Sequence, residues 1–147
     1  MMIPPSPVRL PVARSDWSGL LLPVFEPARV PPPERPWTRS QWQRIAAGAL
    51  PEATDGRWLA FVEHDRLYLH RAATGSGIYE VQFERRGLGR RIVEVLVSTS
   101  RFEYRRSSDE CETLHVEAVI ETFLLRRNVP DKWRMLTTLR SAESSAP

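Results

Sequence analysis

The strongest constraint on how this chain folds is a two-residue alternation of apolar and polar side chains between residues 57 and 97. Four runs in this region are predicted to be strands, and short turns separate them. The runs cover residues 57–63, 66–71, 78–85 and 90–97. Because each connection is short, we expect neighbouring strands to pair antiparallel, as a β-meander.

The alternation also assigns side chains to the two faces of the expected sheet. One face is predicted to be apolar and carries Leu67, Leu69, Tyr79, Val81 and Phe83. The other is predicted to be polar and carries Arg66, Tyr68, His70, Glu80 and Gln82. A single apolar face is expected when helices cover one side only. The fourth run places Val93, Val95 and Val97 on one face and is apolar on nearly both sides, which predicts a central or covered position.

Helical signals flank the strand region. Thr38 and Gln41 have the spacing of a capping box, which predicts a helix over residues 38–48. A wide apolar stripe with acidic residues at its start predicts a second helix over residues 109–126, and residues 133–139 are expected to form a short third helix. We therefore predict an α+β fold, in which an N-terminal and a C-terminal helix cover one face of a four-stranded antiparallel meander.

Proline divides the chain into regions. Ten of the 13 prolines lie in residues 1–37, which are predicted to form an extended arm because proline lacks the amide donor that helices and central strands need. The apolar residues between Trp17 and Phe25 are expected to anchor this arm across the domain. Residues 38–140 are predicted to form a single α+β domain, and residues 141–147 a frayed tail.

Composition and the N-terminal sequence indicate the cellular compartment in which we expect this protein. A length of 147 residues suits one domain, and the single cysteine, Cys111, allows no disulfide within the chain. The N-terminus lacks the basic and apolar regions of a secretory signal, and no apolar stretch is long enough to cross a bilayer. We therefore expect a cytoplasmic bacterial protein that has no membrane partner.

Arginine supplies nearly all of the positive charge. Lys132 is the only lysine, and the net charge is +3. A GC-rich genome explains this bias, but so does a site for phosphate or carboxylate groups, which guanidinium binds in a bidentate way. The charge is too small and too dispersed to favour nucleic acid as the partner.

The segment between residues 70 and 80 has the most distinctive composition. Its glycines would let a backbone approach a ligand, and its hydroxyls and arginine could form a small anion site. The residues proposed to bind a ligand are Tyr68, His70, Arg71, Thr74, Gly75, Tyr79 and Glu80. The alternative is a wide hairpin loop that needs glycine for its turns.

His70 and Glu80 are expected to lie opposite or diagonal to each other on the polar face. A histidine beside a carboxylate is a possible general base with a raised pKa, but the pair also fits a cross-strand contact that solubilises the sheet. The three histidines fit no ligand spacing for a metal, and no loop fits a cofactor, so we predict neither a metal nor a cofactor.

Residues 35–126 resemble a family of small bacterial proteins of unsettled function. The shared pattern reads roughly His-Arg-Ser-Trp-Thr-Gly followed by Ile-Tyr-Glu. In this chain it reads His70-Arg71-Ala72-Ala73-Thr74-Gly75 and then Ile78-Tyr79-Glu80. Ala72 and Ala73 stand where the family has serine and tryptophan. If that tryptophan lines a ligand site in the relatives, the site is altered here.

Two functions fit the sequence. The first is a non-enzymatic binding or accessory module, of the immunity type for example, that acts on a protein partner. It follows from a sequence without a recognisable nucleophile set, metal cluster or cofactor loop. The second is an enzyme or binder for a phosphate-bearing small molecule, such as a nucleotide or an ADP-ribose-like ligand, bound at the segment 70–80.

Overall fold

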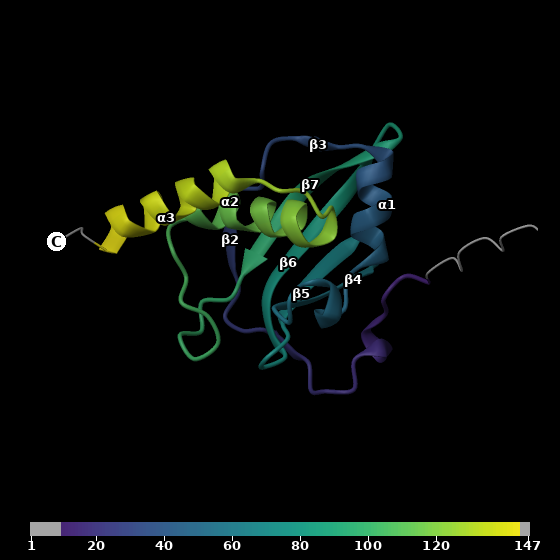
Figure 1. Ribbon diagram of the computed structural model, residues 1–147, viewed down its shortest axis with the longest axis horizontal. Coiled ribbons are helices and arrows are strands. Elements are labelled where there is room, and N and C mark those ends of the chain that lie inside the picture. Colours follow the sequence, from purple (N-terminus) through teal and green to yellow (C-terminus); the bar gives the residue numbers. More distant parts are fainter. Residues whose placement is uncertain (1–9, 145–147) are drawn as a thin grey trace, which may run out of the picture.

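The computed structural model of the chain describes residues 10–144 and has an α+β architecture (Figure 1). The strands are β1 (Leu22–Val24), β2 (Ala28–Val30), β3 (Pro36–Trp37), β4 (Trp58–Glu63), β5 (Arg66–Arg71), β6 (Ser76–Arg86) and β7 (Gly89–Val97). The helices are α1 (Arg39–Ala47), α2 (Asp109–Val119), the π-helix η3 (Ile120–Leu124) and α3 (Pro130–Ser144). Single 3₁₀ turns form at η1 (Arg14–Asp16) and η2 (Pro51–Ala53).

The strands form one open sheet in the order β2-β7-β6-β5-β4. The predicted antiparallel meander is confirmed as β4 to β7, which pair consecutively. A four-stranded sheet nevertheless understates the structure, because the sheet has seven strands. The proline-rich arm supplies the other three: β2 and β3 pair antiparallel with β7, and β1 pairs parallel with the start of β6.

A β-bulge in β7 changes which of its side chains face the core. Gln82 pairs with Glu94, but the next residue, Phe83, pairs with Ile92, so Val93 is an extra residue. Ile92 is therefore buried and Val93 is 40% exposed. The predicted common face of Val93 and Val95 is wrong for this reason, since a bulge interrupts strict alternation.

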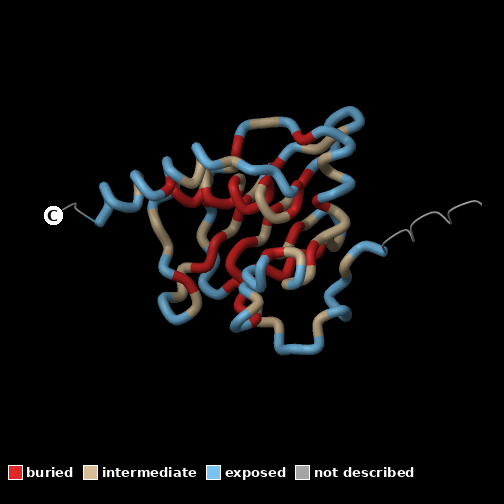
Figure 2. Tube along the Cα trace, in the orientation of Figure 1, coloured by how far each residue is buried: buried red, intermediate tan, exposed pale blue. Residues whose placement is uncertain are grey.

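The helices cover one face of the sheet, and the main hydrophobic core lies between them and the strands (Figure 2). Leu67, Leu69 and Val81 are fully buried there. On α1, Trp42 packs on Phe83 with ring centroids 4.9 Å apart. The prediction that helices cover one apolar face is confirmed. Among the described helices, none is long and apolar enough to span a membrane.

The second face of the sheet has two parts. At its β4–β5 end, Phe61 and His70 are buried, and the guanidinium of Arg14 from the arm lies 4.7 Å from the centre of the Phe61 ring. The expectation of a uniformly polar face is wrong here, because the arm covers this part. Towards β7 the face is polar: Arg66 forms ion pairs with Glu80 at 2.8 Å and with Glu94 at 3.2 Å.

The helix ends follow the capping signals. Thr38 accepts a hydrogen bond from the Gln41 amide, and the Gln41 side chain accepts one from the Thr38 amide, which confirms the capping box. At the start of α2 the Ser108 hydroxyl accepts a hydrogen bond from the Cys111 amide. The helix α3 extends to Ser144, so residues 141–144, expected to be frayed, are helical. Residues 1–9 and 145–147, which belong to the predicted arm and tail, lie outside the described residues.

Candidate functional site

The residues predicted to form one ligand site divide between the two faces of the sheet. Tyr68, His70 and Glu80 belong to the face that the arm partly covers. Tyr79 is fully buried on the helix-covered face, and the guanidinium of Arg71 lies 5.7 Å from the centre of the Tyr104 ring on that side. The sheet therefore separates Arg71 and Tyr79 from the other three.

The glycines of the segment 70–80 admit a backbone, but it is the backbone of the chain's own arm. Gly75 has a φ of +74°, and a Cβ placed on it would lie 1.9 Å from the carbonyl oxygen of Leu20. The Leu22 amide donates a hydrogen bond to the Gly75 carbonyl at 2.9 Å. A Cβ on Gly77 would likewise lie 2.8 Å from the carbonyl oxygen of Leu22. The close approach predicted for a ligand is therefore made by residues 20–22.

The hydroxyls of this segment have partners within the chain. Thr74 Oγ1 donates to Ser76 Oγ at 2.9 Å and accepts from the Ser76 amide. Ser76 Oγ donates in turn to the carboxylate of Glu103. An anion at these hydroxyls would meet the negative charge of Glu103, so the geometry gives phosphate little electrostatic support at Thr74 and Ser76.

His70 and Glu80 lie on one face, as expected, but they do not form a catalytic pair. Tyr68 is the residue opposite Glu80, and Glu80 forms its ion pair with Arg66. Nδ1 of His70 lies 3.0 Å from the Gly75 carbonyl oxygen. Burial lowers the pKa of His70, because the charged imidazolium loses its hydration. The predicted rise of this pKa is wrong in direction.

A buried polar network lies on the helix-covered face, and the sequence did not predict it. The carboxylate of Glu112 accepts hydrogen bonds from the hydroxyls of Tyr79 and Tyr104, the latter at 2.9 Å. It also accepts one from the Ser107 amide at 2.9 Å. Nδ1 of His115 lies 2.7 Å from the Tyr79 hydroxyl. Tyr79 and Glu112 are fully buried, and His115 is 7% exposed.

The hydrogen bonds of this network determine the form of His115. The single hydroxyl proton of Tyr79 is used in its hydrogen bond to Glu112, so the Tyr79 oxygen must accept a hydrogen bond from Nδ1–H of His115. Burial lowers the pKa of His115 to about 3, so the ring is neutral at pH 7. A neutral ring that carries its proton on Nδ1 leaves Nε2 as a hydrogen-bond acceptor.

The same groups are poor candidates for proton transfer near neutral pH. Burial raises the pKa of Tyr79 and Tyr104, so both phenols stay protonated. The pKa of His115 is displaced in the opposite direction. Efficient general acid–base catalysis needs a pKa near the working pH, so the network is better suited to fixing side chains than to moving protons.

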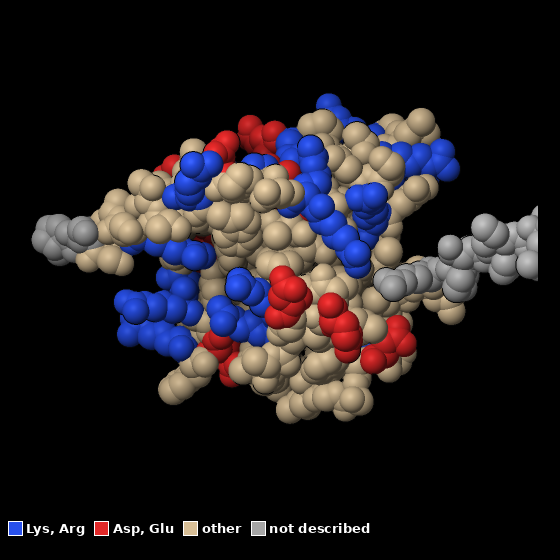
Figure 3. Space-filling view, viewed as in Figure 1, with Lys and Arg blue, Asp and Glu red and all other residues tan. Residues whose placement is uncertain are grey.

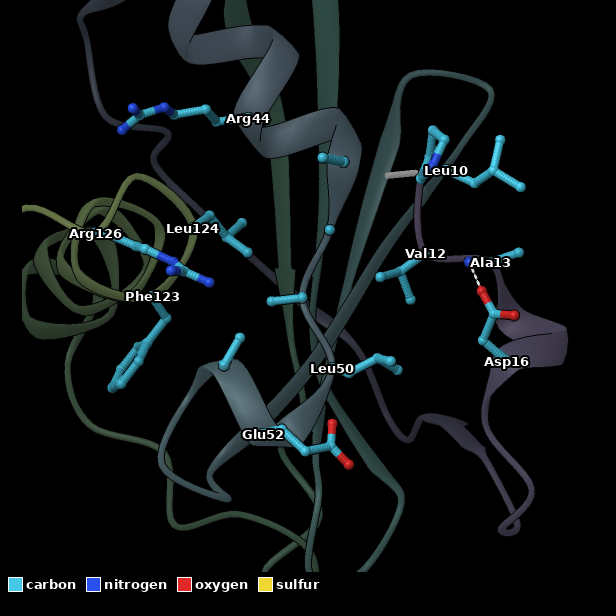
Figure 4. A pocket seen from close by; sticks show the side chains of 15 residues that line it. Leu10, Val12, Ala13, Asp16, Arg44, Leu50, Glu52, Phe123, Leu124 and Arg126 are labelled. Carbon is cyan, nitrogen blue, oxygen red and sulfur yellow. Dashed lines mark hydrogen bonds between the residues drawn. The ribbon is translucent and has the colours of Figure 1, made fainter. Parts of the chain in front are cut away.

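A cleft lies between the arm, α1, η2 and the π-helix (Figure 4). Its volume is about 1160 Å³. The apolar side chains of its lining are Leu10, Pro11, Val12, Ala13, Ala47, Ala49, Leu50, Ala53, Phe123 and Leu124. Arg44 and Arg126 line one side of it, and Asp16 and Glu52 lie across from them.

Unusual backbone geometry shapes the basic side of this cleft. The π-helix is closed by a hydrogen bond from the Leu125 amide to the Ile120 carbonyl at 3.0 Å, and Arg126 follows with a φ of +54°. Nη1 of Arg44 donates to the Leu125 carbonyl at 2.9 Å and so holds α1 against the π-helix. Both π-helical turns and non-glycine residues at positive φ are enriched at functional sites.

Basic and acidic side chains lie in separate groups around the cleft. Figure 3 shows basic side chains gathered beside α1 and acidic side chains below them on the same face of the molecule. Within residues 10–144, no group of three or more His, Cys, Asp or Glu side chains is placed to hold a metal ion.

The sequence contains a recognisable signal for the buried polar network but not for the cleft. Glu112 and His115 are separated by one helical turn on a predicted apolar face, which is a signal for a buried polar pair. The cleft has no such signal, because its lining comes from three separate segments of the chain, residues 10–16, 44–53 and 123–126. Comparison of the chain with known protein families, with curated proteins and with solved structures found no match.

Proposed function

We propose that this chain is a non-enzymatic binding module that holds a peptide segment of a protein partner in the cleft between the arm, α1, η2 and the π-helix. The observation that supports this most is the size and form of the cleft. Small-molecule pockets usually have volumes of about 300–1,000 Å³ and enclose their ligand. At about 1160 Å³ the cleft exceeds that range, and it is partly open to solvent rather than enclosed, as a groove for a peptide is.

Charge complementarity indicates what kind of peptide fits. An acidic side chain of the peptide would approach Arg44 and Arg126, and a basic one would approach Asp16 and Glu52. Apolar side chains between them would pack on the lining of the cleft, where Leu50 and Leu124 lie. The expected segment therefore has an apolar centre with opposite charges at its two ends.

The proposal has a direct test with a library of short random peptides displayed on phage. We expect selection on the whole chain to enrich peptides with an acidic residue, an apolar centre and a basic residue. Arg126→Glu should then weaken binding of an enriched synthetic peptide about tenfold or more, because reversing a charge at the rim replaces attraction by repulsion.

Arg127→Glu is the matched control, since Arg127 is the next residue, is exposed and does not line the cleft. Fluorescence anisotropy measures both variants. The proposal requires binding to survive Arg127→Glu, and binding by Arg126→Glu should recover when the acidic residue of the peptide is replaced by lysine. Equal affinity of the two variants for the original peptide would rule out the cleft as the site.

An immunity-type role, in which the module blocks a harmful protein by binding it, is one use of such a groove. The other candidate function is binding of a phosphate-bearing small molecule. Among the residues predicted to bind such a ligand, the structure favours Arg71. Its guanidinium lies beside Tyr104 of the buried network. It forms no ion pair with a carboxylate in residues 10–144, so its charge is available to an anion.

A further inference from the structure

The hairpin that joins β6 and β7 has a strongly basic tip. Residues 84–91 contain four arginines and one glutamate, so their net charge is +3, which equals the net charge of the whole chain. In Figure 1 the tip lies beside the start of α1 at an outer corner of the molecule, and Figure 3 shows basic side chains at that corner. The positive charge, which is dispersed along the sequence as a whole, is therefore concentrated here.

The arginines lie on both faces of this hairpin. Arg85 pairs with Arg90 in the strand register, and the Arg90 guanidinium lies 4.9 Å from the centre of the Trp42 ring on α1, so this pair belongs to the helix-covered face. Arg86 and Arg91 line a cleft of about 800 Å³ on the second face. Arg85 and Arg86 are exposed and form no ion pair within residues 10–144. Anionic groups can therefore approach the tip from either face.

Two features of the tip are not explained by the needs of the turn. Gly87 and Leu88 are the two turn residues, and Gly87 has the positive φ, +59°, that such a turn uses. Turn positions favour Gly, Asn, Asp and Ser, yet Leu88 stands in one of them and is 77% exposed. The like charges of Arg85 and Arg90 lie directly opposite each other, which destabilises a strand pair. Departures from local rules of this kind are expected at functional sites.

The start of α1 adds to the positive potential of the tip. Gly89 lies against the residue before the cap of α1, since a Cβ placed on Gly89 would be 2.2 Å from the carbonyl oxygen of Trp37. The hairpin is therefore held beside the N-terminus of α1, which is the positive end of the helix dipole. The first turn of α1 contains no acidic residue and begins with the exposed Arg39. An array of phosphates is the partner that this corner attracts.

The exposed leucine distinguishes between the polyanions that carry such an array. On duplex nucleic acid, Leu88 would have to separate stacked base pairs or stay in water. A single strand needs free aromatic rings for its bases, but Trp37 is buried and Trp42 lies under Arg90. At an anionic lipid surface the same leucine enters an apolar layer while the arginines stay among the phosphates. The tip therefore fits lipid better than nucleic acid.

We propose that the β6–β7 hairpin docks on an anionic lipid surface. Leu88 enters the boundary between headgroups and acyl chains, and Arg85 and Arg86 bind lipid phosphates from the two faces of the hairpin. One leucine and a few arginines give reversible attachment. Such a contact needs no spanning helix, so the lack of an apolar stretch long enough to cross a bilayer does not bear on it. The hairpin is separate from the peptide cleft, which none of residues 84–91 lines.

The test is sedimentation of the whole chain with large unilamellar vesicles. One kind contains equal parts of phosphatidylcholine and phosphatidylglycerol, and the other contains phosphatidylcholine alone. We expect the chain to bind the anionic vesicles about tenfold or more tightly than the neutral ones, and to be released by added salt, because the arginines act through screened charges. No binding to the anionic vesicles at low salt, or equal binding to the two kinds, would overturn the proposal.

Variants show whether the hairpin makes the contact. Leu88→Asn and Arg86→Glu should each weaken vesicle binding about tenfold, because the first removes the apolar side chain and the second replaces attraction by repulsion. Both residues are exposed, so the variants should fold, which urea unfolding verifies. Phe102→Asn and Arg101→Glu are the matched controls, since both residues are exposed in the connection between β7 and α2, and they should leave the affinity nearly unchanged. Weaker binding by the controls alone, or by neither hairpin variant, contradicts the assignment.

A short DNA duplex separates the lipid surface from nucleic acid. The duplex is titrated with the chain at the same low salt concentration and followed by fluorescence anisotropy. Vesicle binding that depends on both Leu88 and Arg86 supports the proposal. Duplex binding that is lost in Arg86→Glu but kept in Leu88→Asn, with no binding to anionic vesicles, would assign the hairpin to nucleic acid and overturn the proposal.

Discussion

Both faces of the sheet bury apolar side chains, but to different extents and by different means. On one face, α1, α2 and α3 bury a continuous set of apolar side chains such as Leu67 and Leu69. On the other, an irregular arm covers only the β4–β5 end. Its Arg14 lies over the rings of Phe61 and Tyr68 and is held by an ion pair with Glu63 at 2.9 Å.

The difference shows how an extended segment can replace a helix as a cover. A helix satisfies its own backbone, whereas the arm obtains hydrogen bonds from other parts of the domain: Leu22 donates to the Gly75 carbonyl just before β6, and Val12 donates to the Ala47 carbonyl at the end of α1. The arm also forms one wall of the cleft through Leu10 and Val12. We therefore expect substitutions on the helix-covered face to affect global stability most, and those on the arm-covered face to affect the arm first.

The largest effect is expected at the centre of the helix-covered face. Leu69→Ala should lower the free energy of unfolding by about 2–5 kcal/mol, because Leu69 is fully buried and the surrounding core cannot fill the cavity. Urea unfolding measures this. Leu88→Ala is the control: Leu88 is 77% exposed, and its loss should change stability by no more than about 0.5 kcal/mol. Similar values for the two variants would contradict the assigned core.

His115 should make stability depend on pH. Its pKa is lowered from 6.5 to about 3 in the folded chain, so below pH 6.5 the unfolded chain binds a proton that the folded chain does not. Above pH 6.5, His115 therefore has no effect on the free energy of unfolding. As the pH is lowered from 6 to 4, this free energy falls by about 1.4 kcal/mol per pH unit. His115→Gln should reduce the slope by that amount.

The histidine can also be followed directly. In an NMR titration, the His115 signals should remain those of a neutral ring down to about pH 4. His70 is the internal comparison, since burial lowers its pKa in the same direction on the other face. A midpoint near pH 6.5 for His115 would show that the network is open to water.

On the arm-covered face, Gly75→Ala should cost about 2 kcal/mol or more. The new Cβ would lie 1.9 Å from the Leu20 carbonyl oxygen, in addition to the strain of a φ of +74°. Gly87→Ala is a matched control, because Gly87 has a φ of +59° but no atom within 4 Å of the added Cβ, and only about 1 kcal/mol is expected. Hydrogen exchange at the Leu22 amide should accelerate in Gly75→Ala alone.

The smallest effect is expected for Arg14→Gln. The side chain of Arg14 is 47% exposed, so its ion pair and ring contact together should contribute about 0.5–1 kcal/mol, and less at high salt. Arg29→Gln serves as the comparison, since Arg29 is 81% exposed in its ion pair with Glu94. A loss above about 2 kcal/mol for Arg14→Gln would mean that the arm contributes to the fold as much as a helix does.

The strands and helix starts were predictable because local patterns encode them. The period of two in residues 57–97 predicted β4 to β7, and Thr38 with Gln41 predicted the start of α1. The bulge at Val93 was not predictable, since nothing in a single strand shows that its partner skips a residue. The strands of the arm were missed because their pairing depends on distant partners rather than on their own composition.

The predicted ligand segment shows the limits of composition as a guide to function. Gly75 and Gly77 do admit a backbone, but a sequence cannot say whether that backbone belongs to a ligand or to the same chain. Glu112 and His115 were visible only as polar residues on an apolar helix. Their role became clear when the fold brought them to Tyr79, which is 33 and 36 residues away in the chain.

The most direct test of the proposed function is to map where a selected peptide binds. The whole chain, labelled with ¹⁵N, is titrated with a peptide enriched by the phage selection, and backbone amide shifts are followed by NMR. Binding in the cleft predicts that the largest shifts occur in residues 44–53 and 123–126 and in the arm between residues 10 and 16. Shifts confined to the polar face of β6 and β7, or to residues 98–108, would contradict it.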